Sequence, residues 1–386
     1  MAPLLRSSAE RILTTHVGSL PRPPGVVDLL MAREEGVAVD EDAFETAVRE
    51  AVAAVVARQV EVGVDTVSDG EMGKVSYVTY MKERLSGFGG STVRAVPTDL
   101  LDFPDYPATK ARLEAPGARE HSPACVGPVA MENREPLDRD IANFRAAVEA
   151  NGPTDAFLTA GSPGLITAIY PNQHYPDYEA YLEAVAEAMR AEYEAIAEAG
   201  FVVQIDSPDL ALTRHMSFQD LTDEEFHKRL AQHVEALNHA LRSVPAERSR
   251  LHLCWGNYEG PHHHDVALAD IIGTVLAAKP RAISFEASNP RHAHEWQVWE
   301  EVNLGDDRIL IPGVIDTLTN FVEHPELVAE RIGRFAAIVG RERVIAGTDC
   351  GFGTFAGIER VHSEIAYAKL KSLAEGAEIA SNRLWG

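Results

Sequence analysis

Eight short apolar runs, separated by longer amphipathic segments, constrain the fold of this chain more than any other feature of its sequence. Each run is apolar on successive residues and rich in β-branched side chains, which is typical of parallel strands covered on both faces. The runs are Arg11–Val17, Val64–Ser68, Ala156–Ala160, Phe201–Ile205, Arg250–Cys254, Ala282–Phe285, Ile309–Val314 and Val344–Ala346.

The segments between these runs repeat apolar residues at three- and four-residue spacing, which predicts helices. The predicted helices are Asp42–Glu61, Tyr178–Ala199, Leu221–Leu241, Asp265–Ala278 and Pro325–Val339. Eight strand–helix units predict an α/β fold of the (β/α)₈ TIM barrel type rather than a doubly wound sheet. A doubly wound sheet that binds a dinucleotide should place Gly-x-Gly-x-x-Gly after its first strand, and no such run follows Val17.

One segment interrupts the strand–helix rhythm. The span from Ser86 to about Gly152 is rich in proline, glycine and charge, and it is too long for a simple loop. We therefore expect residues 1–386 to form a single barrel domain with an insertion at about 86–152, after the second strand. The insertion is expected to carry a hairpin and a helix of its own.

The charge balance excludes some classes of partner. The 386 residues include 35 Lys+Arg and 59 Asp+Glu, a formal charge of −24, which repels nucleic acid and anionic lipid surfaces. No apolar stretch approaches the roughly 18 residues needed to span a bilayer. Met1–Ser8 lacks the apolar core of a secretory signal, and the three cysteines are too few for a disulfide framework. We expect a cytoplasmic protein with small-molecule partners; the oligomeric state is not predicted.

A candidate metal site lies at the predicted strand ends, where barrel enzymes carry their chemistry. His252 and Cys254 are two residues apart on one strand, so both side chains point to the same face. Glu286 and Cys350 hold equivalent positions after other strands. A lone buried cysteine is usually a core residue, as we expect for Cys125, but this joint placement predicts one tetrahedral site. Two thiolates and an imidazole favour Zn²⁺.

These residues, in this order, resemble the catalytic barrel of the cobalamin-independent methionine synthase family. The resemblance extends from Thr14 to Thr354 and includes single-barrel relatives such as the epoxyalkane:coenzyme M transferases. It implies that the four residues above are the zinc ligands. It also implies a set of residues that hold the amino acid moiety of homocysteine, namely Val17, Gly18, Ser19, Glu71 and Asp206.

Each of those substrate positions also has a plainer interpretation. Asp206 precedes Pro208 and could cap a helix, Glu71 could be a solvated loop carboxylate, and Gly18 with Ser19 could form a turn. The chain also departs from the family pattern. Thr317 and Leu318 occupy positions where the family places a proton-donating histidine, and the folate-facing segment 161–167 lacks its tryptophan.

Three histidines are candidate proton donors in place of the missing one. His262 and His263 follow the fifth strand within a His-His-His run, on the loop that starts at the zinc ligands. The run is also compatible with a solvated loop or with incidental metal binding. His215 follows the fourth strand and is the third candidate.

The function expected from these features is a zinc-dependent thiol alkyltransferase. It would transfer a methyl group from methyltetrahydrofolate, or a related donor, to a zinc-activated thiol such as homocysteine. Glu286, a hard oxygen donor on a borderline metal, is the predicted exchangeable ligand. The alternative is an epoxyalkane:coenzyme M transferase, in which a zinc-bound thiolate opens an epoxide. A second alternative is a non-catalytic binding module with structural zinc.

Overall fold

The protein is described by a computed structural model that covers residues 5–93, 95–114 and 121–386. Two sequence-based predictions fall partly outside these residues. They are the absence of a secretory signal, which includes residues 1–4, and the insertion, which includes residues 94 and 115–120. Within the described ranges, every helix is too short or too polar to cross a bilayer.

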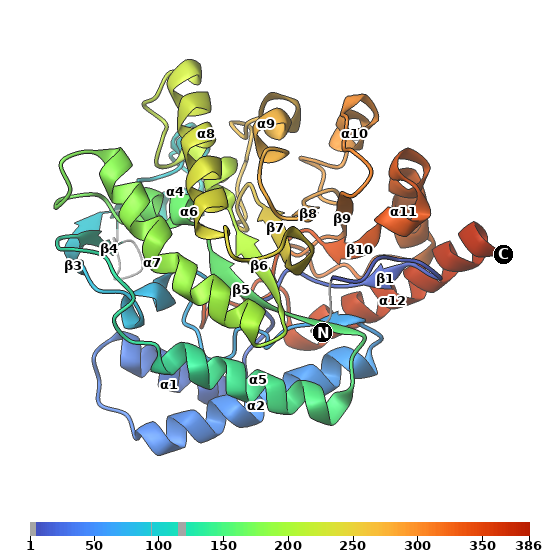
Figure 1. Cartoon of the computed structure of the whole chain (residues 1–386), viewed down its shortest axis with the longest axis horizontal. Coiled ribbons are helices and arrows are strands. Elements are labelled where there is room, and N and C mark those ends of the chain that lie inside the picture. Colours follow the sequence, from blue (N-terminus) through green and yellow to red (C-terminus); the bar gives the residue numbers. More distant parts are fainter. Residues whose placement is uncertain (1–4, 94, 115–120) are drawn as a thin grey trace.

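Eight parallel strands form the barrel, as predicted (Figure 1). The strands run around it in the order β1-β10-β9-β8-β7-β6-β5-β2, and a parallel bridge between Thr15 and Thr66 joins its first and last members. Each strand overlaps one predicted apolar run. Their bounds are β1 Leu13–Thr14, β2 Thr66–Val67, β5 Asp155–Gly161, β6 Val202–Asp206, β7 Ser249–Leu253, β8 Ala282–Phe285, β9 Ile309–Ile315 and β10 Ile345–Thr348.

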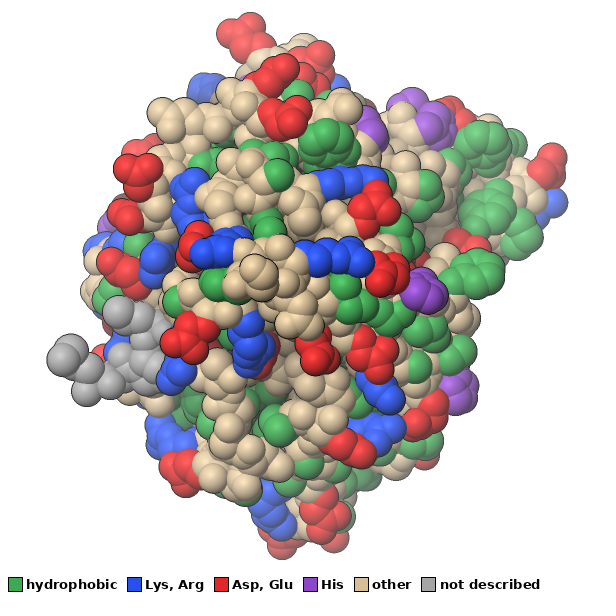
Figure 2. Space-filling view, turned by 90° about the vertical axis from the view of Figure 1, so that its right-hand side faces the viewer, with side chains coloured by type: hydrophobic (Ala, Val, Ile, Leu, Met, Phe, Trp, Pro, Cys, Tyr) green, Lys and Arg blue, Asp and Glu red, His purple; other side chains and the backbone are tan. Residues whose placement is uncertain are grey.

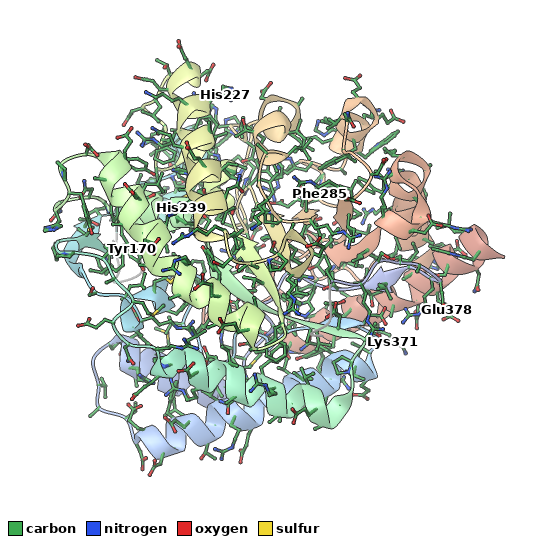
Figure 3. All side chains as sticks on the ribbon, in the orientation of Figure 1. Tyr170, His227, His239, Phe285, Lys371 and Glu378 are labelled. Atoms are coloured by element: carbon green, nitrogen blue, oxygen red, sulfur yellow. The ribbon has the colours of Figure 1, made fainter. Side chains whose placement is uncertain are left out.

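Helices surround these strands. The long ones are α1 Pro24–Glu34, α2 Glu41–Glu61, α5 Glu135–Asn151, α7 Tyr178–Glu198, α8 Asp223–Ala240, α11 Pro325–Val339 and α12 Ser363–Trp385; the short ones are α6 Pro163–Ile169, α9 Leu268–Val275 and α10 Val298–Glu301. Polar caps fix several helix starts, such as the Thr222–Glu225 capping box of α8. In Figure 3, Phe285 lies in the interior while Lys371 and Glu378 point outward from α12.

Helix α9 is shorter than the predicted Asp265–Ala278 helix, and its neighbours explain why. The Leu268 N–H donates to Glu295 Oε1 at 2.7 Å, which satisfies a free donor at the helix start. The Asp265 carboxylate instead accepts from His262 and His292 at 3.1 Å each. The segment before Leu268 is therefore held in a loop.

Between β2 and β5, the described residues include two short helices and an antiparallel pair of strands, in place of the predicted hairpin; they are β3 Phe88–Val93, α3 Thr98–Leu101, α4 Pro107–Glu114 and β4 His121–Cys125. After them, α5 packs beside α2 in the outer helix layer. The buried Arg84 anchors the start of this segment by pairing with Glu192 of α7 at 2.8 Å and with Asp140 of α5 at 2.5 Å. Cys125 is buried at the end of β4.

A buried layer of polar side chains inside the barrel fixes the positions of the strand ends that carry the candidate site. Arg250 of β7 donates to Gln204 Oε1, Thr15 Oγ1 and the His16 carbonyl at 2.8–2.9 Å. Gln204 in turn donates to Asp206 Oδ1 at 2.7 Å and to the Val17 carbonyl. These bonds fix the ends of β1 and β6 relative to each other. The outer surface differs in character, because acidic and basic side chains are interspersed over the face shown in Figure 2.

Candidate metal and substrate site

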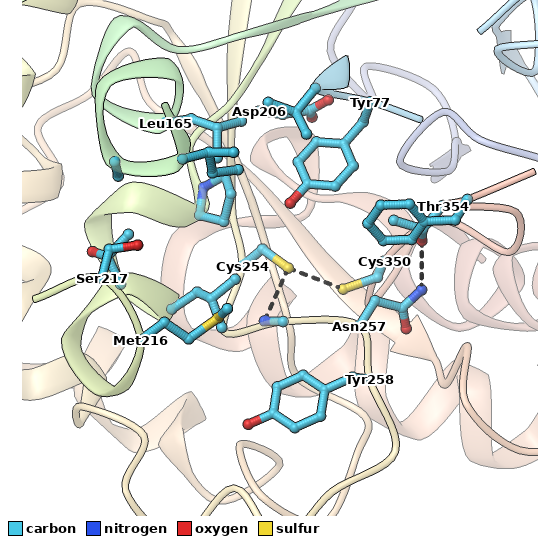
Figure 4. Close-up of a pocket in the computed structure, with 18 of the residues that line it drawn as sticks. Tyr77, Leu165, Asp206, Met216, Ser217, Cys254, Asn257, Tyr258, Cys350 and Thr354 are labelled. Carbon is cyan, nitrogen blue, oxygen red and sulfur yellow. Dashed lines mark hydrogen bonds between the residues drawn. The ribbon is translucent and has the colours of Figure 1, made fainter. Parts of the chain in front are cut away.

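Two buried thiols lie side by side at the C-terminal ends of β7 and β10. Cys254 Sγ is 3.3 Å from Cys350 Sγ, and both side chains face the same space in Figure 4. Cys254 Sγ also accepts a hydrogen bond from Gly256 N at 3.3 Å. The bond to Cys254 and burial raise the pKa of Cys350 well above its usual value. Such a pair is costly to ionise without a nearby cation, so it favours a metal.

His252 and Glu286 complete the set that the sequence predicted. His252, Cys254 and Cys350 each offer a ligand atom within 4.8 Å of the others, and Cys350 Sγ is 3.7 Å from Glu286 Oε1. Burial lowers the pKa of His252 to about 3, so the imidazole is neutral, as a metal ligand must be. Its Nδ1 has no hydrogen-bond partner among the described residues. These donors fit a tetrahedral N/S/O site.

The Glu286 carboxylate has protein partners on both oxygens. Oε1 accepts from the Trp255 N–H at 2.8 Å, while Oε2 accepts from Asn289 Nδ2 at 2.8 Å and from Arg291 Nη2 at 2.6 Å. The side chain is fully buried, so these bonds offset the cost of removing its charge from water. The carboxylate is therefore held beside the thiols without depending on a metal.

Asp349 holds the loop that carries this carboxylate. Its oxygens accept from the backbone N–H groups of Ala287, Ser288 and Asn289 at 2.8–3.0 Å. Burial, followed by the charge of Glu286, raises the pKa of Asp349 to about 6. The residue before Cys350 thus ties the end of β10 to the loop after β8.

Two carboxylates face the same cavity as the thiols. Asp206 ends β6 directly beside His252 in the strand register, and Glu71 lies four residues beyond β2. Burial, followed by the charge of Glu71, raises the pKa of Asp206 to about 8. Burial also raises the pKa of Glu71, whose Oε2 lacks a hydrogen-bond partner among the described residues. The buried side chains of Lys74 and Arg22 supply part of the positive charge near Glu71, and two desolvated carboxylates so close together favour a further cation.

The loop after β1 packs against Glu71 and against the segment that follows Cys350. Gly18 has a φ of 142°, and a Cβ there would lie 2.6 Å from Thr159 Cγ2 and 3.0 Å from Glu71 Oε1, so only glycine fits. The Ser19 carbonyl accepts from the Phe352 N–H at 2.9 Å, just past Cys350. This contact brings the predicted substrate loop next to the predicted metal ligands.

A cavity of about 530 Å³ joins these groups. Its polar end contains Ser19, Glu71, Asp206, His252, Cys254 and Cys350. Its other walls are mainly apolar and come from the β3–α3 segment, α6, the loop after β6 and the loop after β10. They include Val93, Val96, Leu165, Ile169, Leu212, Met216, Phe355 and Ile358. Glu286 is not a lining residue, since it lies behind the thiols.

The three predicted proton donors do not line this cavity. Both ring nitrogens of His262 have partners, Asp265 at 3.1 Å and the Tyr258 carbonyl at 3.0 Å. His215 Nε2 lies 3.1 Å from the Tyr258 hydroxyl, behind the cavity wall. His263 is on the surface, bonded to Asp102. The fold therefore separates these histidines from the thiol end of the cavity.

Sequence reasoning assigned no role to Asn289, Arg291 or Asp349, although they hold the candidate ligand Glu286. Asn289 and Asp349 closely follow the apolar runs 282–285 and 344–346, at the strand ends where barrel enzymes carry their chemistry, so their positions carry a signal. Arg291 carried none, because its contact depends on the turn that follows Asn289.

This arrangement defines a barrel protein whose C-terminal strand ends carry a thiol-rich candidate metal site next to a cavity lined by two carboxylates. The chain belongs to the family described as cobalamin-independent synthase, catalytic domain, which matches residues 12–97 and 157–376. Between these two parts, residues 98–156 are unmatched, and they belong to the inserted segment and to the start of β5. The resemblance predicted from the sequence is therefore confirmed.

Named relatives match along nearly their whole length. The methionine synthase of Saccharolobus solfataricus is 26% identical over 376 residues, covering 96% of this chain and 95% of the relative. The methionine synthase of Thermococcus kodakarensis is also 26% identical, with coverages of 96% and 94%.

Solved structures confirm the fold. A B12-independent methionine synthase from Shewanella sp. W3-18-1, in complex with selenomethionine, superposes with a TM-score of 0.74 at 19% identity, covering 97% of this chain and 99% of that chain. A putative B12-independent methionine synthase from Listeria monocytogenes gives a TM-score of 0.67 at 18% identity, with the same coverages.

Proposed function

We propose that this protein transfers a methyl group to the thiol of homocysteine, using Zn²⁺ held by His252, Cys254, Glu286 and Cys350. The observation that carries the proposal is one cavity that has both thiols and both carboxylates, Glu71 and Asp206, at the same end. Family membership and the methionine synthase relatives support methyl transfer as the reaction.

The donor set supports zinc as the metal. Two buried thiols, a neutral imidazole and a carboxylate suit a borderline metal better than magnesium or calcium, which prefer oxygen ligands. When bound, zinc would supply a deprotonated thiol at neutral pH, where a free thiol with a pKa near 8.5 is mostly protonated.

The carboxylates explain why the thiol substrate should be an amino acid. Glu71 and Asp206 would pair with the substrate ammonium, whose charge relieves their repulsion in the buried pocket. The strained backbone of Glu71, with a φ of 58°, positions this carboxylate, and the Thr159 hydroxyl orients it at 3.1 Å. We propose that Val17 and Ser19, which line the cavity, contact the rest of the amino acid, and that Gly18 supports them by allowing the close approach of this loop to Glu71.

Glu286 is proposed as the exchangeable ligand because its alternative partners are already in place. Trp255 N–H, Asn289 and Arg291 satisfy the carboxylate in the structure. A closed structural metal site would hold four tightly bound ligands, whereas this carboxylate can remain paired away from the metal. This argues against the non-catalytic structural-zinc module.

The methyl donor would occupy the mostly apolar part of the cavity. Thr317 is buried where the family places a proton-donating histidine, and its hydroxyl lies 3.5 Å from Asn257 Oδ1. We propose that His215 and His262 support Tyr258 rather than donate protons, since the Tyr258 ring lies against His262 with centroids 4.0 Å apart. A methylfolate or a related methyl donor is the proposed source of the methyl group.

The epoxide alternative has less support from the pocket. A sulfonate-bearing thiol such as coenzyme M would meet Glu71 and Asp206 where it needs cationic side chains. The absence of the folate-facing tryptophan and of the family's histidine favours the alternative, so the test includes it.

A substrate panel tests the proposal. Zinc-loaded protein would be incubated with homocysteine or coenzyme M as the thiol, and with methyltetrahydrofolate, other methyl donors or small epoxides as the donor, with products identified by mass. We expect methionine from homocysteine. Formation of a hydroxyalkyl thioether from coenzyme M, with no methionine from any methyl donor, would replace the proposal with the alternative.

A further inference from the structure

The exposed histidines of the His-His-His run converge on one carboxylate. His263 Nε2 lies 2.8 Å and His264 Nε2 2.6 Å from Oδ2 of Asp102, which follows α3 in the inserted segment. We propose that Asp102, His263 and His264 form a second metal site, which binds a first-row divalent ion such as Ni²⁺ or Zn²⁺ and fastens the inserted segment to the loop after β7.

The geometry suits such an ion. The three ligand atoms lie within 4.8 Å of one another, and metal–nitrogen bonds of about 2.0–2.1 Å need only a small opening of this group. Two imidazoles select zinc, nickel or copper over magnesium or calcium. The side chains are 42–52% exposed, so an ion can enter from solvent and water can complete its coordination.

The rings are already arranged as neighbouring ligands. The centroids of His263 and His264 are 4.2 Å apart with an interplanar angle of 38°, and the Phe103 ring lies edge-on to His263 at 5.5 Å. The Nε2 atoms of both histidines already lie within 2.8 Å of Asp102 Oδ2. Little side-chain entropy therefore remains to be lost when a metal ion binds.

The proposed ligands come from two distant parts of the chain that already touch. Asp99 Oδ2 accepts from the Tyr258 hydroxyl at 2.7 Å and from the His262 N–H at 2.8 Å. Val96 and Pro97, just before Asp99, line the main cavity, and so does Tyr258. An ion at Asp102 would therefore stabilise one wall of the substrate cavity from outside it.

A neighbouring cluster of Asp99, His215 and His262 makes a useful contrast. Its ligand atoms are as close, but they are buried and the structure uses them differently. Asp99 Oδ2 already has two donors, and both His262 nitrogens are bonded to Asp265 and to Tyr258. A metal there would have to displace these bonds, whereas the exposed group loses only its two contacts to Asp102.

Metal counting in equilibrium dialysis tests the second site. Zinc-loaded wild-type protein, dialysed against micromolar Ni²⁺, should bind one nickel per chain without losing zinc. Asp102→Asn and the double variant His263→Gln/His264→Gln should each weaken nickel binding by at least about tenfold, because losing even an outer-shell partner of a metal costs 10–100-fold. Asp105→Asn and His174→Gln are matched controls on exposed residues and should bind nickel like wild type.

Two further measurements separate this site from the thiol site. Cys350→Ser should still bind the nickel ion, so the inference stands or falls independently of the proposed function. Hydrogen exchange at residues 98–106 should slow when Ni²⁺ binds wild type but not Asp102→Asn. No nickel below millimolar concentration in wild type, or unchanged binding in both ligand variants, would overturn the inference.

Discussion

Arg291 donates a hydrogen bond from Nη2 to Oε2 of Glu286 at 2.6 Å, and its other terminal nitrogen lies 3.3 Å from Asp265 Oδ2. The guanidinium therefore lies between the candidate metal ligand and the histidine-rich loop after β7. Because Glu286 is fully buried, Arg291 and Asn289 keep its charge paired.

We predict that Arg291→Met lowers methyl transfer by about 10–100-fold, the usual cost of removing an outer-shell partner of a metal ligand. Most of the zinc should remain, because the four ligands are unchanged. Single-turnover methyl transfer and zinc content would be measured on the same samples. Wild-type rates in the variant would show that Arg291 has no part in positioning Glu286.

Removing either thiol should remove the metal. Cys254→Ser and Cys350→Ser are expected to lose most of their zinc while keeping wild-type circular dichroism, since both side chains lie at strand ends rather than inside the barrel. Cys125→Ser is the matched control, because Cys125 is buried at the end of β4, away from the site, and should leave zinc content unchanged. Full zinc occupancy in both site variants would contradict the ligand assignment.

The choice of thiol should depend on Asp206. A charge-assisted hydrogen bond contributes roughly 1.5–3 kcal/mol, so Asp206→Asn should weaken homocysteine binding on the order of 10- to 100-fold. Zinc content should not change, and coenzyme M should bind equally well or better. Calorimetric titration with both thiols checks this. Unchanged homocysteine affinity together with tighter coenzyme M binding would favour the epoxide reaction.

Stability should fall on mild acidification because of His16. Burial lowers the pKa of His16 to about 3, and the neutral ring bonds Gln59 at 2.7 Å and accepts from the Gly18 N–H at 3.2 Å. The unfolded chain takes up a proton near pH 6.5, which the folded chain does not, so stability is full above that pH and decreases below it.

The contribution of this one group between pH 6.5 and 5.5 is about 1 kcal/mol. The free energy of unfolding would be measured by urea denaturation at both pH values. Its decrease from pH 6.5 to 5.5 should be about 1 kcal/mol smaller in His16→Gln than in wild type. His174→Gln, on an exposed residue, should keep the wild-type drop. An equal drop in all three proteins would mean that His16 is not kept neutral by the fold.

The barrel, and the clustering of the candidate metal ligands at one end of it, could be predicted, because the strands follow from short-range patterns and their ends meet at one face. The apolar runs mark strands by their period, and His252 with Cys254 share a face because they are two residues apart. The surroundings of Glu286 could not be predicted, since Asp349 and Arg291 reach it through loop conformations that hydrogen bonds fix only in the folded chain. The surroundings of the histidine run could not be predicted either, because the conformation of the loop after β7 pairs His262 with Asp265 and His263 with Asp102, and neither side chain lines the cavity.

Proton release on ligand binding tests the central claim, thiol activation, most directly. Homocysteine and methionine carry the same ammonium and carboxylate groups, so any proton that Asp206 releases should be released on binding of either ligand. Only homocysteine carries a thiol proton as well. Calorimetry of zinc-loaded protein at pH 7, in two buffers of different ionisation enthalpy, gives the number released for each. We predict about one more proton per chain for homocysteine, and no such difference in Cys350→Ser. Equal release for the two ligands on zinc-loaded wild type would contradict the claim.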